Sequence, residues 1–146
     1  MSEGLTYPQK ASACRKGSYI MINNHPCKII DMSISKTGKH GHAKCKFTAK
    51  DIFDNTQHEL VQTSTHNVDI PNVKRTEYQL SNIEDEDYIE IMDDNANIRS
   101  DLQLPKDNLE LSNNIKQMFE KGVDCMITVL SACEKDMVVD CKKITT

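Results

Sequence analysis

The sequence has 146 residues, of which 38% are hydrophobic and 27% charged, and it lacks tryptophan, so any core must be mainly aliphatic. No apolar run approaches the length of a membrane span or a secretory signal, which argues against those classes and favours a cytoplasmic protein. Residues 1–73 carry a net charge of +3 and residues 74–146 a net charge of −7, whereas the whole chain carries −4. We therefore expect only the first half to face a polyanion.

The first half of the chain shows strand patterns after an aperiodic start. Residues 1–13 have no periodicity and predict a mobile tail. Residues 18–22 and 27–32 are rich in β-branched side chains and flank an Asn-Asn-His-Pro turn, which predicts two strands. Further along, residues 43–50 and 59–63 predict two more strands.

One of these predicted strands carries a row of lysines. Small or apolar side chains alternate there with polar ones, and three of the polar ones are Lys44, Lys46 and Lys50. The two-residue period of a strand places these lysines on one face. That face is either the solvated outer side of a half-buried strand, or it extends the positive field of Lys36 and Lys39 toward phosphates.

A proline-containing connector separates two predicted domains. Residues 68–73 have an extended pattern, and Pro71 bars a helix there. The charge balance changes sign at the same point. We therefore place the boundary near residues 72–75, with one domain over 14–73 and the other over 74–146.

The second domain predicts five strands and one helix. The helix begins at Asp107 as N-cap, with Glu110 three residues later, and ends at Lys121 and Gly122. Its apolar face is expected at Leu111, Ile115, Met118 and Phe119. The strands are expected at residues 77–80, 88–92, 98–102, 125–130 and 137–141. This order is compatible with an OB-fold, a five-stranded barrel used on nucleic acids and oligosaccharides.

A glycine-rich segment links two of the strands predicted in the first half. Gly38 and Gly41 flank Lys39, and glycine tolerates positive φ, so the segment predicts a narrow protruding loop with the lysine at its apex. A lysine there is a flexible cation that can reach into a partner or be modified. The alternative is a solvated hairpin tip, which describes most turns of this composition.

Patterns typical of enzymes and metal sites are missing from the sequence. Lys39 is not followed by Ser or Thr, and Ser33 stands where a phosphate-binding P-loop needs glycine. No nucleophile elbow or zinc-protease motif occurs, so we expect no enzyme. Six cysteines without a C-x-x-C pair indicate reduced thiols. We expect no metal, because a set of five candidate ligands fits no common zinc-finger spacing: His25, Cys27, His40, His42 and Cys45.

The loop and the strand before it carry a long motif. Residues 26–44 read Pro-Cys-Lys-Ile-Ile-Asp-Met-Ser-Ile-Ser-Lys-Thr-Gly-Lys-His-Gly-His-Ala-Lys. This run closely resembles the eukaryotic translation initiation factor 5A family, and the resemblance continues at residues 51–53, 64–75, 101–105 and 127–132. Three departures leave the motif itself intact: residues 45–50, residues 123–126, and Ile34 in place of the usual Thr.

The resemblance implies a fold and a modification. The implied fold is all-β with one helix, an N-terminal SH3-like barrel that carries the loop followed by a C-terminal OB-fold barrel. Lys39 is expected to become hypusine through an aminobutyl group from spermidine and a later hydroxylation. Deoxyhypusine synthase and deoxyhypusine hydroxylase would install it, so the chain needs no cofactor of its own. The loop residues expected to support modification and to contact tRNA and the ribosome are Ser35, Lys36, Thr37, Gly38, His40, Gly41, His42 and Lys44.

The implied function is that of a ribosome-binding translation factor, in initiation and elongation. Hypusinated Lys39 would reach beside the acceptor end of peptidyl-tRNA, support peptide-bond formation at stalled sequences such as proline runs, and aid termination. It would position the substrate and not act as an acid or base. The alternative is a two-barrel RNA-binding module whose Lys39 is never modified and which binds through the basic strand at Lys46 and Lys50. Whether the chain forms a homodimer stays open.

Overall fold

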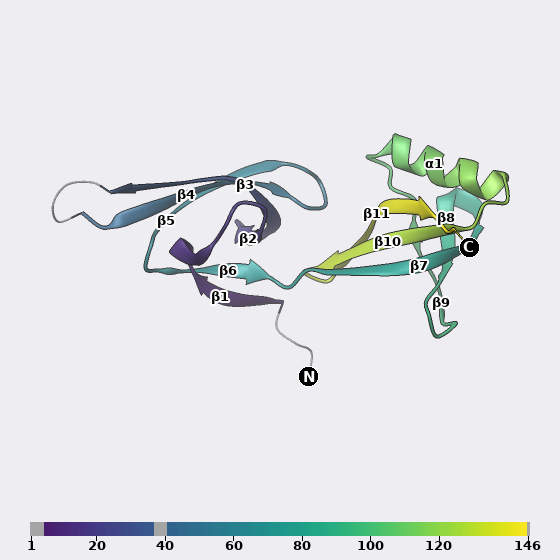
Figure 1. Cartoon of the computed structure of the whole chain (residues 1–146), viewed down its shortest axis with the longest axis horizontal. Helices are drawn as coiled ribbons and strands as arrows, with labels where there is room; N and C mark the ends of the chain where they lie inside the picture. The colour runs from purple at the N-terminus through teal and green to yellow at the C-terminus, as the bar shows by residue number, and fades with distance from the viewer. Residues whose placement is uncertain (1–4, 37–40, 146) are drawn as a thin grey trace. The chain divides into compact units, whose positions relative to one another are not determined.

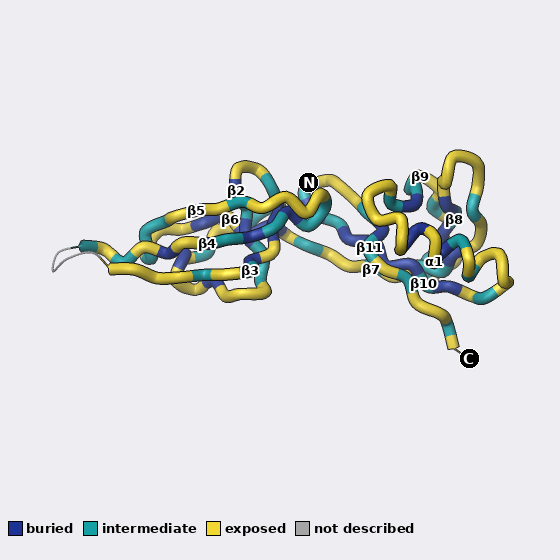
Figure 2. The backbone as a smooth tube through the Cα atoms, turned by 90° about the horizontal axis from the view of Figure 1, so that it is seen from above, coloured by how far each residue is buried: buried dark blue, intermediate teal, exposed yellow. Residues whose placement is uncertain are grey.

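The computed structural model describes residues 5–36 and 41–145, which form eleven strands, one α-helix and two short 3-10 turns (Figure 1). The chain divides into two compact units, Met1–Val73 and Lys74–Thr146, and each has its own hydrophobic core. In both units most of the buried residues lie on the strands, as Figure 2 shows. The described part is therefore mainly β with a single α-helix, which confirms the expected fold class.

The N-terminal unit is built on a curled four-stranded antiparallel sheet, as expected for an SH3-like barrel. Its strands lie in the order β2 (Tyr19–Ile22), β3 (His25–Lys36), β4 (Ala43–Asp51) and β5 (Gln57–Thr63). Alternate residues of β4 are buried, as the two-residue period requires. The core of this unit contains Ala11, Cys14, Ile20, Ile22, Cys27, Ile29, Cys45, Phe47, Ala49, Val68 and Ile70.

The prediction of a mobile tail over residues 1–13 is wrong for the residues that the structure describes. β1 (Thr6–Lys10) pairs antiparallel with β6 (Asn67–Pro71), and the 3-10 turn Ala11–Ala13 follows. Ala11 is fully buried, and its N–H donates to the carbonyl of His66 at 2.9 Å. Because most side chains of β1 stay exposed, this ribbon has no apolar alternation for a sequence pattern to show.

The C-terminal unit is the OB-fold. Its sheet has the antiparallel order β11-β10-β7-β8-β9. The strands and the helix are β7 (Lys74–Ile83), β8 (Tyr88–Met92), β9 (Ile98–Gln103), α1 (Leu109–Glu120), β10 (Cys125–Ala132) and β11 (Lys135–Lys143). The single helix stands between the third and fourth of these strands, as predicted.

The start of α1 differs by one residue from the prediction. Asn108 and not Asp107 is the N-cap, since its side chain accepts a hydrogen bond from the N–H of Leu111 at 3.1 Å. Both residue types can cap a helix, so composition could not choose between them. The buried residues of α1 lie in its first two turns and include Ser112, whose hydroxyl donates to the Pro105 carbonyl. Phe119, in the last turn, stays 38% exposed.

The six cysteines form no disulfide within the described part of the chain, and four of them are buried. Burial raises the pKa of Cys27 to about 12, with the carboxylates of Asp51 and Asp54 adding to the rise. Burial also raises the pKa of Cys125 to about 11. These thiols therefore stay protonated in the folded chain at pH values where an exposed cysteine ionises.

We expect the free energy of unfolding to decrease as the pH rises above about 8.5, the ordinary pKa of cysteine. The thiols then ionise in the unfolded chain only, so their contribution is complete below that pH and is lost progressively toward pH 11 to 12. Urea midpoints measured from about pH 7.5 to about pH 10.5 check this. Cys27→Ala should flatten the profile, and an unchanged slope in that variant would contradict the assignment.

Candidate functional site: the β3–β4 hairpin

The glycine-rich segment connects two long paired strands. β3 has 12 residues, and at about 3.3 Å per residue it extends roughly 35–40 Å. It pairs with β4 from Cys27 opposite Asp51 to Lys36 opposite Ala43. Figure 1 shows β3 and β4 side by side up to this end of the sheet. Residues 37–42 are left to join the two strands.

The structure places the predicted loop residues in three groups. Ser35 and Lys36 belong to β3 and Lys44 to β4, and all three are exposed. Gly41 and His42 precede β4 without regular structure, and His42 is exposed. Thr37, Gly38, Lys39 and His40 lie outside the described residues. The role of Lys39 therefore stays a prediction from the motif.

Near the loop, the strands of the hairpin are anchored in the core of the N-terminal unit. Cys45 and Phe47 of β4 are fully buried, and the thiol of Cys45 lies 3.4 Å from the hydroxyl of Ser64. The N–H of Ser64 donates to the carbonyl of Ala43 at 2.9 Å, beside the last pair of the hairpin. Buried contacts and backbone hydrogen bonds thus fix the strands that lead into and out of the loop.

The lysines of β4 lie on its outer face, as predicted, but a carboxylate on the neighbouring strand offsets part of their positive charge. Lys44, Lys46 and Lys50 alternate with buried residues of β4, and Lys50 is only half-exposed. The Nζ of Lys46 lies 4.0 Å from a carboxylate oxygen of Glu59 in an exposed ion pair, which offsets part of its charge. The register adds Lys28, which lies opposite Lys50 and which the sequence analysis missed. The sequence could have indicated this, because Lys28 stands between the apolar residues Cys27 and Ile29 and must therefore point to the outer face of the strand.

The five side chains weighed as a zinc set do not form one site among the described residues. His25 begins β3, whereas Cys45 lies opposite Ile34, about 30 Å further along the hairpin. Cys27 is buried, and His40 lies outside the described residues.

In the described ranges no helix is long and apolar enough to cross a membrane.

Two family models together match most of the chain. The model described as "Translation initiation factor 5A-like, N-terminal" matches residues 4–66. The model described as "Eukaryotic elongation factor 5A hypusine, DNA-binding OB fold" matches residues 72–142. The two matches meet near the division between the two compact units.

Similar proteins and solved structures agree with these models. Eukaryotic translation initiation factor 5A-1/2 of Solanum tuberosum is 45% identical over 141 residues, which are 97% of this chain and 88% of that protein. Eukaryotic translation initiation factor 5A-2 of Schizosaccharomyces pombe is 47% identical over 138 residues, 94% of this chain and 80% of that protein.

The translation initiation factor eif-5a family protein from Naegleria fowleri superposes with a TM-score of 0.89 at 39% identity, covering 95% of this chain and 99% of that one. The eukaryotic translation initiation factor 5A from Methanococcus jannaschii has a TM-score of 0.73 over 97% of this chain and 100% of that one, and at 24% identity it supports the fold alone. The models, the relatives and the superposition agree in one assignment: the chain belongs to the eukaryotic translation initiation factor 5A family of translation factors.

Proposed function

We propose that this translation factor binds the ribosome and uses hypusinated Lys39 to position the acceptor end of peptidyl-tRNA. The positioning supports peptide-bond formation at stalled sequences such as proline runs, and it aids termination. The chain needs no catalytic group of its own for this role, because restricting the orientation of a reacting group is itself a large contribution to rate.

The observation that carries the proposal is the pairing of the hairpin up to Lys36 and Ala43. It attaches both ends of the connection 37–42 to strands held by buried Cys45 and Phe47. Because the connection is short and both of its ends are fixed, the position from which the lengthened cationic side chain extends is restricted. It can therefore direct phosphate and ribose contacts on RNA without reading bases.

The exposed residues at the root of the loop extend this contact. Ser35, Lys36 and Lys44 face solvent beside the connection, and we assign them contacts to tRNA and the ribosome together with His42. The same role is proposed for Thr37, Gly38, His40 and Gly41 on the motif alone. Deoxyhypusine synthase and deoxyhypusine hydroxylase act on Lys39 in the cytoplasm, and this role needs no cofactor bound by the chain itself.

Peptide mapping of protein purified from its native source should find the hypusine adduct on Lys39 and leave Lys36 unmodified. The two lysines lie close in sequence, but only Lys39 stands between Gly38 and Gly41. Lys36→Arg is the matched control, and this variant should still gain the adduct. An unmodified Lys39 in cells that modify other proteins of this family would refute the proposal.

A second function is favoured by the lysines on the outer face of the sheet. Lys28, Lys44, Lys46 and Lys50 could bind RNA phosphates while Lys39 stays unmodified. Such a module would lose affinity steeply with salt and would not depend on the aminobutyl group. The variant Lys39→Arg, considered in the Discussion, separates this function from the first.

A further inference from the structure

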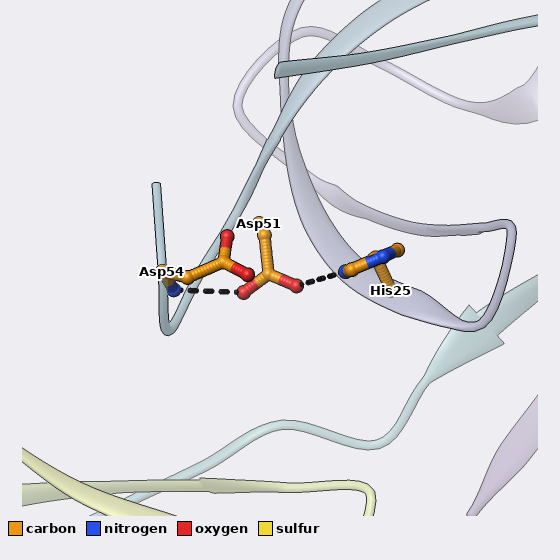
Figure 3. A group of neighbouring side chains, drawn as sticks. All are labelled: His25, Asp51 and Asp54. Carbon is orange, nitrogen blue, oxygen red and sulfur yellow. Dashed lines mark hydrogen bonds and ion pairs between the residues drawn. The ribbon is translucent and has the colours of Figure 1, made fainter. Parts of the chain in front are cut away.

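Three metal-ligating side chains meet at the end of the N-terminal unit away from residues 37–42. His25 is the first residue of β3, Asp51 the last of β4, and Asp54 lies in the turn that follows. Figure 3 shows the Asp51 carboxylate between the other two side chains. The Nδ1 of His25 lies 2.7 Å from the Oδ2 of Asp51, and one ligand atom from each residue lies within 4.8 Å of the others.

Each carboxylate is held through one oxygen. The Oδ1 of Asp51 accepts hydrogen bonds from the N–H groups of Phe53 at 2.7 Å and Asp54 at 3.0 Å. The Oδ1 of Asp54 accepts from the N–H of Thr56 at 2.9 Å and from its hydroxyl. These bonds orient both carboxylates, as the supporting contacts of metal-binding carboxylates do. The second oxygen of Asp51 meets the Nδ1 of His25, and the second oxygen of Asp54 is left for a ligand.

The ring of His25 is oriented by His58 on the neighbouring strand. The two imidazole rings stack with centroids 4.1 Å apart and planes 24° apart. The Nε2 of His58 lies 2.8 Å from the hydroxyl of Thr56. Because that hydroxyl gives its single hydrogen to Asp54, the Nε2 of His58 must be the donor. A histidine binds an ion in the plane of its ring, and two stacked rings cannot both have the same ion in their planes. His58 therefore orients His25 and is not itself a ligand.

The local field favours a cation. Hydrogen bonds from Thr56 hold the pKa of Asp54 below its ordinary value, so this carboxylate is ionised at neutral pH. Asp51 is only 5% exposed, whereas His25 is 38% exposed, so the cluster joins a buried carboxylate to an opening toward solvent. Two neighbouring carboxylates repel each other, and an ion between them removes that repulsion.

We propose that His25, Asp51 and Asp54 form a binding site for a first-row divalent cation, with Zn²⁺ the ion that best suits one imidazole and two carboxylates. His25 binds through Nδ1, and its ring proton moves to Nε2 or is released, with no change of oxidation state. Ligand atoms about 2.0–2.2 Å from Zn²⁺ stand roughly 3.4 Å apart in tetrahedral geometry. The Nδ1–Oδ2 pair therefore opens by less than about 1 Å, and water completes the coordination.

The site shares only His25 with the five candidate ligands weighed from the sequence, because His25 and Asp51 are 26 positions apart and meet through the strand register. A bound ion joins the start of β3, the end of β4 and the turn before β5. It thus stabilises the base of the hairpin that carries the functional loop. The inference is independent of the role proposed for Lys39.

Calorimetric titration of the full chain with Zn²⁺ should show one site, lost or weakened at least tenfold in Asp54→Asn and in His25→Gln. Asparagine keeps an oxygen that accepts from Thr56, and glutamine keeps a donor toward Asp51, so both variants preserve local hydrogen bonding. Asp93→Asn is the matched control. Asp93 accepts two backbone hydrogen bonds in a turn, as Asp51 does, at 2.9 Å each, but it lies in the other unit. This control should bind as the parent does.

The six thiols could also bind Zn²⁺, and titration with Co²⁺ separates the two cases. A nitrogen and oxygen ligand set gives visible bands without the intense near-ultraviolet sulfur-to-metal bands of thiolate coordination. Circular dichroism of each variant without metal verifies the fold. Absence of binding to the parent, undiminished binding to folded Asp54→Asn, or thiolate bands in the Co²⁺ spectrum would each overturn the site.

Discussion

Lys39→Arg should abolish the relief of stalling on proline-rich reporters while leaving the fold intact. Arginine keeps the positive charge but cannot accept the aminobutyl group as the lysine amine does. At the loop apex that the sequence predicts, this substitution should change stability by no more than about 0.5 kcal/mol, so circular dichroism and the urea midpoint should match the parent. Reporter translation should fall to the level measured without the factor, because the shorter cation cannot reach the place of the lengthened amine.

The matched control for this variant is Lys36→Arg, on an exposed residue of β3 beside the same loop. It preserves both the charge at position 36 and the modification at Lys39, so it should keep nearly full reporter activity. Full activity of folded Lys39→Arg would instead favour the module that binds RNA through Lys28, Lys44, Lys46 and Lys50.

Phe47→Ala should unfold much of the N-terminal unit and leave the C-terminal unit folded. Phe47 is fully buried, and in the sheet it lies opposite Met32 on one side and Leu60 on the other. Removing a buried phenylalanine ring costs about 3–5 kcal/mol, a large fraction of the stability of a small domain. The core of the C-terminal unit shares no residue with this one.

Amide spectra residue by residue are the measurement for Phe47→Ala. Signals of the N-terminal unit, β1 included, should lose dispersion or broaden, and those of residues 74–146 should keep their positions. Val61→Ala is the matched control on β5, because Val61 is 57% exposed, and it should change stability by no more than about 0.5 kcal/mol. Loss of both sets of signals in Phe47→Ala would show that the two units share one folding equilibrium.

The regular parts of the fold could be predicted because their apolar residues recur with the period of a strand or a helix, which shows which side chains are buried. In β4, buried Cys45, Phe47 and Ala49 alternate with exposed or half-exposed residues, and this period identifies the strand and its facing. In the C-terminal unit, the buried pair Leu111 and Ile115 locates the helix in the same way.

Other parts depend on contacts that no local pattern contains. β1 is held by pairing with β6, which lies far along the chain, and its polar side chains give no period. The facing of Lys28 follows from the register with β4, and the cluster of His25, Asp51 and Asp54 follows from the same pairing. Lys39 was identified through a motif, because its Gly-Lys-His-Gly segment has the same physical properties as many glycine-containing turns without a function.

The β-bulge between Ile29 and Asp31 governs which changes of length the hairpin tolerates. β3 has one residue more than β4 at this point, and the extra residue lets both Ile29 and Met32 face the core side. A single insertion in one strand beyond the bulge, if no second bulge absorbs it, would turn the later side chains of that strand to the opposite face. Inserting two residues in each strand would preserve the facing and carry the tip about 6.6 Å further out. Hairpin lengths in this family should therefore vary in steps of two on each strand.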